Sequence, residues 1–438
     1  MRFLLIILLL NTWTPLLLAQ KKKESRQHPD RKEFVAADKT YETAIKTVLL
    51  YPYTGQVADY LQAAIVPLSQ PYPLLLSFDD LKEDIDDYYV KIIHCNADWS
   101  KSSLSEIQYL YEYNEFFITE RQNSINAFVP YIHYKFYLPK VKISGNYVVK
   151  VYRDYDEEDI ILSKRFMVFE NVNNSVIINT DIKFARTVSE RDKSQQVDFS
   201  ISYGQLNLVN PAATVKVVIR QNHRWDKAIY NLPPMFVKEH ESILEYNYFN
   251  MENAFKGGNE FNAFDISSLI TYRLNVGKII PQPNLYEVIL LPDISRGTQS
   301  YSLFPDIDGK FWIEHYESGE REYSPDYVLV NFVLNVPRQN GDIYVRGSMN
   351  DWLMNEQSLM IYNEEIKKYT GRMLLKQGYY NYLYTLVNST SPYGNDEYFS
   401  GSHSQTQNVY DIMVYYRAPG ERADLLIGYS SVNFMKRN

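Results

Sequence analysis

The stretch YVLVNFVLNV (residues 327–336) shows the pattern that decides the fold. Every second residue of this stretch is strongly apolar: Val328, Val330, Phe332, Leu334 and Val336. Side chains alternate between the two faces of a β-strand, so this pattern predicts a strand with one face against a core. The downstream pair Asn340-Gly341 predicts a two-residue hairpin, because both residues accept positive φ. Residues 343–345 are then expected to pair back.

The same alternation recurs towards the N-terminus. Residues 131–138 alternate until Pro139 ends the run, and Gly145-Asn146 opens a second strand at 147–152. An acidic turn follows, and 160–169 returns. These short connections predict antiparallel sheet, because the chain offers no helix long enough for parallel crossovers.

Further strands are predicted by the same reasoning in the middle and at the end of the chain. They are 197–203, 214–220, 243–247, 285–291, 369–375, 379–386, 411–416 and 425–429. Lys376-Gln377-Gly378 is expected to turn one strand into the next, and Asp306 to Gly309 is expected as a hairpin turn.

Polar turns near 171–174 and 324–326 separate groups of strands. We therefore expect an all-β protein of tandem antiparallel, immunoglobulin-like β-sandwiches. The expected domains cover 34–172, 173–325 and 326–438.

Residues 1–20 are interpreted as a secretory signal peptide, with an apolar run at 3–10 and the small residue Ala19 near the cut. A membrane anchor is the competing interpretation, but Asn11 and Pro15 interrupt the apolar stretch. No later segment is apolar enough to span a membrane as a helix. We therefore expect no direct membrane span.

Cysteine usage points to a compartment. Cys95 is the single cysteine of 438 residues, so it forms no internal disulfide. Export without disulfides is more typical of a Gram-negative periplasmic protein than of a eukaryotic extracellular one. We expect Cys95 to be a small buried apolar residue.

Charge and aromatic content limit the classes of partner. The formal net charge is −8, and Lys and Arg are not gathered into a phosphate-binding face, so no nucleic acid is expected. Tyrosine accounts for 39 residues, which is typical of strands and of binding interfaces.

Two clusters of polar residues resemble sites, and each has a simpler interpretation. His94 and Cys95 with Asp98 could suggest a metal or a thiolate nucleophile, but neighbours on a strand point to opposite faces. An acidic cluster is expected to be a solvated turn or short helix, because it has no glycine turn of a calcium loop. Its members are Asp79, Asp80, Glu83, Asp84, Asp86 and Asp87.

Nothing in the sequence carries a known catalytic signature. G-x-S-x-G, H-E-x-x-H, a phosphate-binding P-loop and a dinucleotide fingerprint do not occur. The expectation is a protein that works by binding, with no catalytic residue, no bound cofactor and no metal ligand.

One local motif suggests carbohydrate. Gly347-Ser348-Met349-Asn350-Asp351-Trp352, together with the turn and strand at 376–382, resembles the glycogen-binding type of carbohydrate-binding module. In such modules aromatic faces stack on sugar rings. The resemblance implies a sandwich for the C-terminal domain, but sugar binding does not follow from the fold. Trp352 is expected to be a structural core residue rather than a ligand platform.

Several segments together resemble one family, the plug protein of the bacterial type IX secretion system. They are SGNYVVKVY (144–152), GGNEF (257–261) with Phe264-Asp265, LKQGYYNY (375–382), and VYYR (414–417) leading to LLIGY (425–429). One departure is Ala254-Phe255-Lys256 before the glycine pair, where a more aromatic lead containing proline is expected. Gly257 and Gly258 are interpreted as turn formers.

This resemblance implies a function. A plug of this family is non-catalytic and seals the periplasmic opening of a very large outer-membrane translocon barrel while no cargo is loaded. The implied partner is that barrel, and the implied location is the periplasm, at the inner face of the outer membrane. Two alternatives remain open: a periplasmic glycan-binding protein that uses Trp352, and an envelope enzyme with a carboxylate pair that sequence spacing does not reveal.

Overall fold

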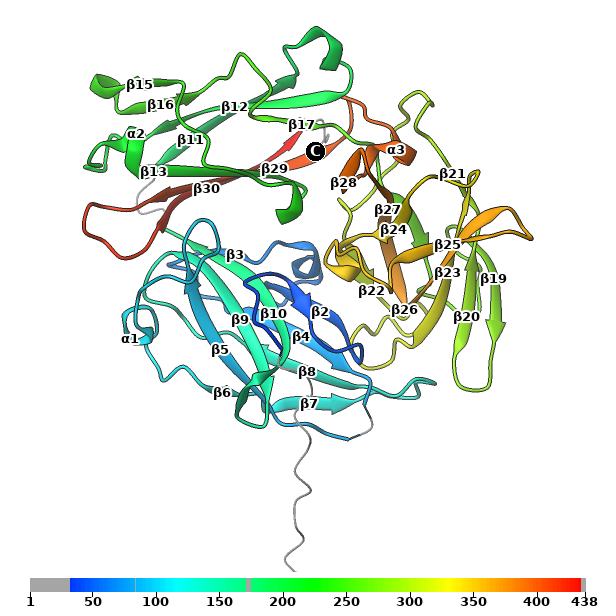
Figure 1. Cartoon of the computed structure of the whole chain (residues 1–438). Coiled ribbons are helices and arrows are strands. Elements are labelled where there is room, and N and C mark those ends of the chain that lie inside the picture. Colours follow the sequence, from blue (N-terminus) through cyan, green and yellow to red (C-terminus); the bar gives the residue numbers. More distant parts are fainter. Residues whose placement is uncertain (1–31, 83, 171–174, 435–438) are drawn as a thin grey trace, which may run out of the picture.

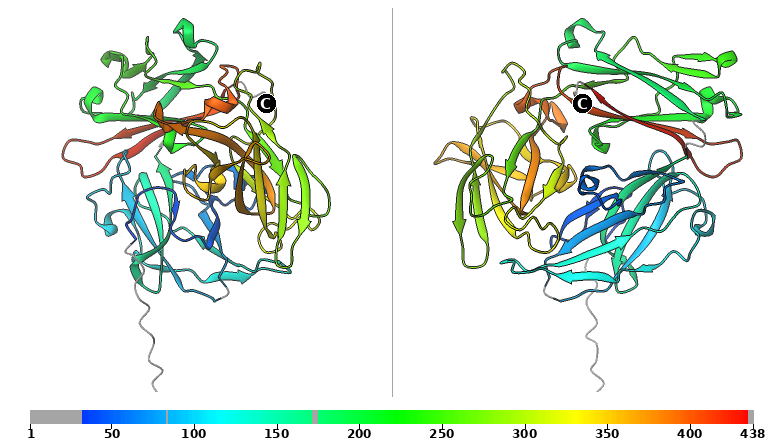
Figure 2. Two further views of the ribbon diagram at one scale, coloured as in Figure 1. Left: turned by 45° about the vertical axis from the view of Figure 1, so that its right-hand side comes forward. Right: turned by 180° about the vertical axis from the view of Figure 1, so that it is seen from behind.

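A computed structural model of the chain describes residues 32–82, 84–170 and 175–434. The expected signal peptide lies outside the described residues. The structure is built almost entirely of β-strands, which form three lobes around a common centre (Figures 1 and 2). The predicted all-β class of tandem β-sandwiches is confirmed.

The first lobe packs two sheets face to face. One has the order β1-β10-β9-β5-β6, with β3 beside β10, and the other the order β2-β4-β8-β7. The bounds are β1 Lys39–Thr40, β2 Ile45–Pro52, β3 Ile65–Pro67, β4 Leu74–Asp80, β5 Tyr88–Cys95, β6 Phe116–Phe117, β7 Glu120–Asn123, β8 Ile132–Tyr137, β9 Gly145–Arg153 and β10 Asp156–Phe169. The acidic turn predicted after residue 152 joins β9 to β10 through Asp154 and Tyr155. Both of these have positive φ, as a two-residue hairpin turn requires.

The second lobe combines strands from two distant parts of the chain. One sheet has the order β11-β12-β16-β15, with β17 beside β12, and the other the order β14-β13-β29-β30. The bounds are β11 Ile177–Phe184, β12 Ser194–Ser202, β13 Val215–Gln221, β14 Ile229–Tyr230, β15 Phe236–Lys238, β16 Ile243–Tyr246, β17 Ala254–Lys256, β29 Asn408–Tyr416 and β30 Leu425–Phe434.

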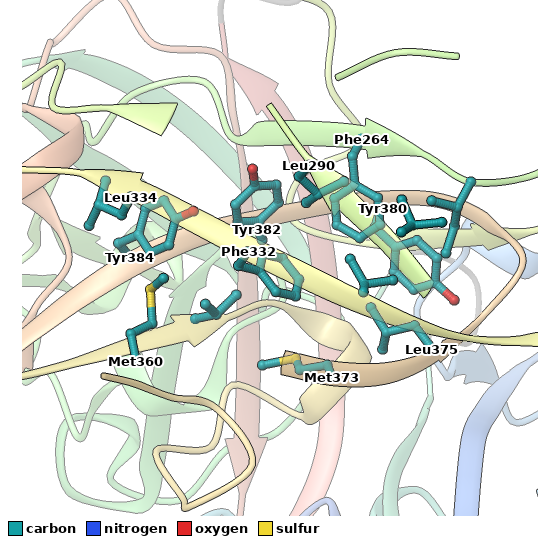
Figure 3. Close-up of a cluster of buried hydrophobic side chains, with 14 of the residues drawn as sticks. Phe264, Leu290, Phe332, Leu334, Met360, Met373, Leu375, Tyr380, Tyr382 and Tyr384 are labelled. Atoms are coloured by element: carbon teal, nitrogen blue, oxygen red, sulfur yellow. The ribbon is translucent and has the colours of Figure 1, made fainter. Parts of the chain in front are cut away.

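The third lobe contains an extended, bent sheet of order β18-β27-β24-β25-β26-β23-β20-β19, with β21 beside β23 and with β22 and β28 beside β27. The bounds are β18 Asn262–Asp265, β19 Val276–Pro281, β20 Tyr286–Leu290, β21 Asp293–Ile294, β22 Phe311–Ile313, β23 Tyr327–Asn335, β24 Asp342–Arg346, β25 Leu359–Asn363, β26 Lys368–Lys376, β27 Gly378–Asn388 and β28 Ser391–Asn395. The alternating face predicted for 327–336 fills its core, where Phe332 packs edge-on against Phe264 and Tyr382 (Figure 3).

Helices are short and peripheral. The α-helices are α1 Glu106–Tyr109, α2 Pro211–Thr214 and α3 Glu397–Ser400, and the 3-10 turns are η1 Val57–Leu61, η3 Val188–Glu190, η4 Trp225–Lys227, η5 Glu239–Glu241 and η6 Ser348–Asn350.

The sheets do not follow the expected domain boundaries. β13 pairs with β29 over Val215–Gln221, so the end of the chain completes the second lobe instead of the C-terminal sandwich. Conversely, β18 to β22 precede residue 326 but join the third lobe. The chain therefore enters the third lobe and returns from it, a path that strand patterns alone do not reveal.

The predicted hairpins of the third lobe are wrong. β23 and β24 do not pair, because β25 and β26 lie between them in the sheet. Asn340 has no positive φ, and the φ of Gly341 is +146°, far from the left-handed region of the expected turn. The predicted Asp306–Gly309 hairpin is wrong as well, since β22 pairs with β27.

The expectation of purely antiparallel sheet also needs correction. Three strand pairs are parallel: β3 with β10, β20 with β23, and β21 with β23. In each case the chain between the two strands crosses over without a long helix, whereas the prediction assumed that parallel strands need one.

Candidate functional site at the lobe interfaces

The interface between the first and third lobes is centred on a buried carboxylate, Asp79 of β4. Lys376 Nζ donates to Asp79 Oδ2 over 2.7 Å, and the Tyr327 hydroxyl donates to the same oxygen over 2.7 Å. His133 Nδ1 lies 2.6 Å from Asp79 Oδ1. Burial by itself would raise the pKa of Asp79, but Lys376 and His133 hold it below its ordinary value. The carboxylate therefore stays charged and joins the two lobes.

Aromatic and backbone contacts surround this ion pair. Lys376 Nζ lies 4.1 Å from the ring centroid of Tyr131, in the geometry of a cation–π interaction. The Tyr131 hydroxyl in turn donates to the Glu322 carbonyl over 3.0 Å. Asp326 accepts the Phe128 backbone N–H over 2.8 Å. Each of these contacts joins a first-lobe residue to a third-lobe residue.

The interface between the first and second lobes is apolar. Its buried members are Cys95, Ala97, Trp99, Val148 and Met167 of the first lobe and Val218, Met413, Tyr415 and Leu426 of the second. Trp99 meets Trp225 edge-on, with ring centroids 4.8 Å apart. The Tyr415 hydroxyl donates to Asn146 Oδ1 over 2.8 Å, so this polar tip is satisfied inside the apolar cluster.

The interface between the second and third lobes is an ionic cluster around Asp396. Arg224 Nη2 lies 2.8 Å from Asp396 Oδ2, and Arg346 Nη1 lies 3.2 Å from Oδ1. Lys227 Nζ is 3.3 Å away. Burial opposes ionisation of Asp396, but the three cations hold its pKa far below the ordinary value. Such a cluster is strongly destabilised when one partner is removed.

A cavity of about 480 Å³ lies where the three lobes meet. Trp99, Trp225 and Trp352, one from each lobe, are among its lining residues. At its edge Lys164 of the first lobe pairs with Asp351 of the third. Each lobe thus contacts the other two, and the molecule is held as one body.

The motif that suggested carbohydrate is part of this interface. The Arg224 guanidinium lies 4.0 Å from the Trp352 ring centroid, and Phe261 lies 5.8 Å from it. Trp352 is half-buried, and the Arg224 guanidinium occupies one face of its ring. The ring holds two lobes together instead of presenting an open face to a sugar.

Cys95 and His94 are both buried in the first lobe. Burial raises the pKa of the Cys95 thiol to about 12, so the thiol stays protonated. Burial also lowers the pKa of His94 to about 4, so its imidazole is neutral. Cys95 lies in the cluster against the second lobe, while His94 packs on Tyr147 in the first-lobe interior. Asp98 is exposed.

The acidic cluster is only partly the solvated turn that the sequence suggested. Asp84 and Asp87 are exposed, and Glu83 lies outside the described residues. Asp79 and Asp80, however, are fully buried in β4. Asp80 accepts the Tyr88 hydroxyl over 2.6 Å. The partner of Asp80 lies on the next strand, but Lys376 and Tyr327 are far from Asp79 in the sequence, so sequence spacing does not reveal them.

Sequence reasoning also missed Glu260, in the GGNEF segment that joins the second lobe to the third. Glu260 is 1% exposed and accepts the Tyr301 hydroxyl over 2.6 Å. Burial, together with the nearby Asp306 carboxyl, raises the pKa of Glu260 to about 7. The backbone at Gly257 passes so close to the backbone at His403 that a Cβ on residue 257 would lie 2.0 Å from the His403 carbonyl oxygen, so only glycine fits at this position.

Among residues 32–82, 84–170 and 175–434, no group of three or more His, Cys, Asp or Glu side chains is arranged to hold a metal ion. Within these ranges no helix has the length and apolar character to cross a membrane.

Comparison with known proteins places the chain in a family. Residues 45–170 match the family model described as type 9 secretion system plug protein 1st domain. A crystal structure of a hypothetical protein from Parabacteroides merdae ATCC 43184 shares 30% sequence identity and a TM-score of 0.85, over 92% of this chain and 100% of that chain. The chain belongs to the same family as this protein from Parabacteroides merdae, and its residues 45–170 are similar to the first domain of the plug protein. No curated protein matches it.

The match of residues 45–170 to the plug first domain links the chain to type 9 secretion. The matched residues include β2 to β10, so they cover most of the first lobe. The relative from Parabacteroides merdae matches nearly the whole chain, so the arrangement of all three lobes is shared. The family match supports the resemblance to the plug protein over residues 45–170, which include the SGNYVVKVY segment (144–152).

Proposed function

We propose that this protein is a non-catalytic plug that seals the periplasmic opening of the type 9 secretion translocon barrel while no cargo is loaded. The match of residues 45–170 to the plug first domain carries this proposal. The expected periplasmic location, at the inner face of the outer membrane, belongs to the same proposal.

The interfaces between the lobes support a sealing role. A seal must keep its shape when solvent and solutes press on it, and three independently moving domains would leave gaps. Here the buried Lys376–Asp79 pair joins the first and third lobes, and the Asp396 cluster joins the second and third. Interfaces with buried, hydrogen-bonded ion pairs fix one relative orientation, because other orientations leave charges unpaired. The three lobes therefore act as one rigid body that can close an opening.

The glycan-binding alternative gains no support from the site. Its single suggested platform, Trp352, stacks against Arg224 of another lobe. The enzyme alternative gains no support from the pair of Glu260 and Asp306, since Glu260 is 1% exposed at a lobe junction beside the half-buried Asp306.

A pull-down tests the proposal. The tagged protein is recovered from detergent-solubilised outer membranes, and its companions are identified by mass spectrometry. We expect a giant β-barrel in near-stoichiometric amount, and we expect this recovery to fall when cargo-delivery partners saturate the channel. Recovery of no barrel from idle membranes would contradict the proposal.

A further inference from the structure

The three interfaces between lobes share one chemical feature. In each, a cation from one lobe lies over an aromatic ring of another lobe. The pairs are Lys376 over Tyr131 at 4.1 Å, Arg224 over Trp352 at 4.0 Å, and Arg165 over Trp225 at 5.5 Å. Desolvated cation–π contacts of this kind stabilise the interface that contains them. This chain therefore repeatedly builds contacts between surfaces by placing a cation on an aromatic ring.

One aromatic surface of the first lobe is used by neither of the other lobes. Tyr113, Phe117 and Tyr155 are 78%, 41% and 66% exposed. Phe117 and Tyr155 lie against Tyr89, with ring centroids 5.2 Å and 3.8 Å from it. Tyr152 adjoins Tyr89 at 6.0 Å. We call these five residues the first-lobe aromatic face.

The position of this face leaves it open. Its residues come from β5, from β9 with the turn into β10, from the segment between α1 and β6, and from β6 itself. Figure 1 shows β6 and the β9–β10 turn at the lower end of the first lobe, away from the second lobe above and the third lobe on the right. The other end of the same sheet carries Cys95, Val148 and Met167, which pack on the second lobe. The sheet is thus covered at one end and uncovered at the other.

Carboxylates surround the aromatic face. Burial, the Tyr155 hydroxyl and the Asp87 and Asp154 carboxylates together raise the pKa of Tyr89. On the opposite side, the Tyr152 hydroxyl donates to Glu115 over 3.0 Å. Negative charge beside exposed rings attracts a cation, because it adds to the negative potential of the ring faces.

The chain's own cations do not cover the exposed rings. Lys91 and Lys150 both pair with Glu157, and Lys150 Nζ lies 5.6 Å from the ring centroid of the buried Tyr152. The neighbouring Tyr111 already has Lys142 at 5.2 Å from its ring centroid. In the described part of the chain, no cation lies over Tyr113, Phe117 or Tyr155. The three exposed rings of the face thus lack the cation that lies over an aromatic ring in each interface between lobes.

We propose that the first-lobe aromatic face docks a protein loop that presents Arg or Lys side chains. The inference rests on the proposed function, under which the loop belongs to the translocon barrel. Tyrosine and arginine dominate the binding energy of protein interfaces, so a few contacts here would account for much of the affinity.

The test uses a variant in which each replacement suits its backbone. Tyr113→Ser, Phe117→Thr and Tyr155→Asn are combined, since asparagine tolerates the positive φ of residue 155. The matched control combines three exposed third-lobe residues, as Tyr272→Ser, Leu303→Ser and Tyr393→Thr. Circular dichroism and the melting temperature show that all three proteins are folded. Each is then used to pull the barrel from solubilised outer membranes.

We expect the wild type and the control to recover the barrel, and the face variant to recover roughly tenfold less or lower still. Equal recovery by all three proteins would overturn the docking face and leave the plug function standing. Loss of recovery by the control as well as the face variant would also overturn it, since the effect would not be specific to this face. Recovery of no barrel even by the wild type would overturn the plug function and this inference together.

Discussion

Lys376 Nζ lies 2.7 Å from Asp79 Oδ2, although the two residues are 297 positions apart in the chain. Their side chains are 1% and 0% exposed. This pair sits between the first and third lobes and connects β26 with β4. Because neither charge reaches water, each depends on the other for its stabilisation, and the interface exists in one arrangement.

We expect Lys376→Met to lower the free energy of unfolding by about 3–5 kcal/mol, because it leaves the Asp79 carboxylate buried without its cation. Urea unfolding measures the change. The double variant Lys376→Met with Asp79→Asn is expected to recover part of the loss, since it removes both charges. If the single and double variants are equally unstable, the pair is not the source of the effect.

The interface between the first and second lobes is expected to open more often when the hydrogen bond between Tyr415 and Asn146 is removed. Tyr415→Phe leaves Asn146 Oδ1 buried without its donor and costs about 1–3 kcal/mol. Cys95 lies in the same cluster, so its reaction with a thiol reagent reports the opening. We expect faster labelling of Cys95 in Tyr415→Phe than in wild type. Tyr416→Phe is the control, because that hydroxyl makes only an exposed contact with Val209; equal rates in all three proteins would contradict this account.

Glu260 should make stability depend on pH. In the unfolded chain its pKa returns to the ordinary value of 4.5, whereas the folded value is about 7. Between these values the folded protein holds a proton that the unfolded chain has released, so stability falls as pH rises through this window and levels off above it. Glu260→Gln removes the titration. We expect its melting temperature to change less than that of wild type between pH values of about 5 and 8.

Parallel pH profiles for wild type and Glu260→Gln would show that the buried carboxyl does not titrate in this range. Tyr301→Phe serves as a separate check on the surroundings, because it removes a hydrogen bond to Glu260 that favours the ionised form. Tyr301→Phe is therefore expected to raise the pKa of Glu260 further, so that stability goes on falling to a higher pH than in the wild type.

Trp352 is predicted to matter for stability and not for sugar. Trp352→Ala removes a ring that Arg224 and Phe261 contact, and truncation of a buried tryptophan costs about 3–5 kcal/mol, with a smaller loss expected at this half-buried position. In gels that contain glycogen, we expect the wild type to migrate as it does without glycogen. Retardation of the wild type that Trp352→Ala abolishes would revive carbohydrate binding.

Strands and the all-β class could be predicted from the sequence, because alternation is a local property. Residues 147–152 and 160–169 fall inside β9 and β10, and 285–291 encloses β20. Pairing between strands could not be predicted where the chain leaves a sheet. The Asn340-Gly341 signal failed because Tyr369 to Lys376 of β26 already occupy the position next to β23.

The candidate site was largely beyond sequence reasoning. Asp79 lies in an acidic run that resembles a solvated turn, and its partners Lys376 and Tyr327 come from the third lobe. The signal that could have pointed to interfaces was the high tyrosine content. Tyr131, Tyr327 and Tyr415 each bring an aromatic body and a hydrogen-bonding tip to a lobe interface. Which tyrosines do so depends on tertiary contacts, and these are set by the whole fold.

The most direct test of the sealing role is the permeability of the outer membrane in cells that lack this protein. A strain deleted for it is challenged with an antibiotic too large for ordinary porins, under conditions in which little cargo is exported. We predict that the deleted strain becomes sensitive, that cargo export continues, and that the wild-type protein restores resistance. Unchanged resistance in the deleted strain, with the translocon barrel present, would contradict the account.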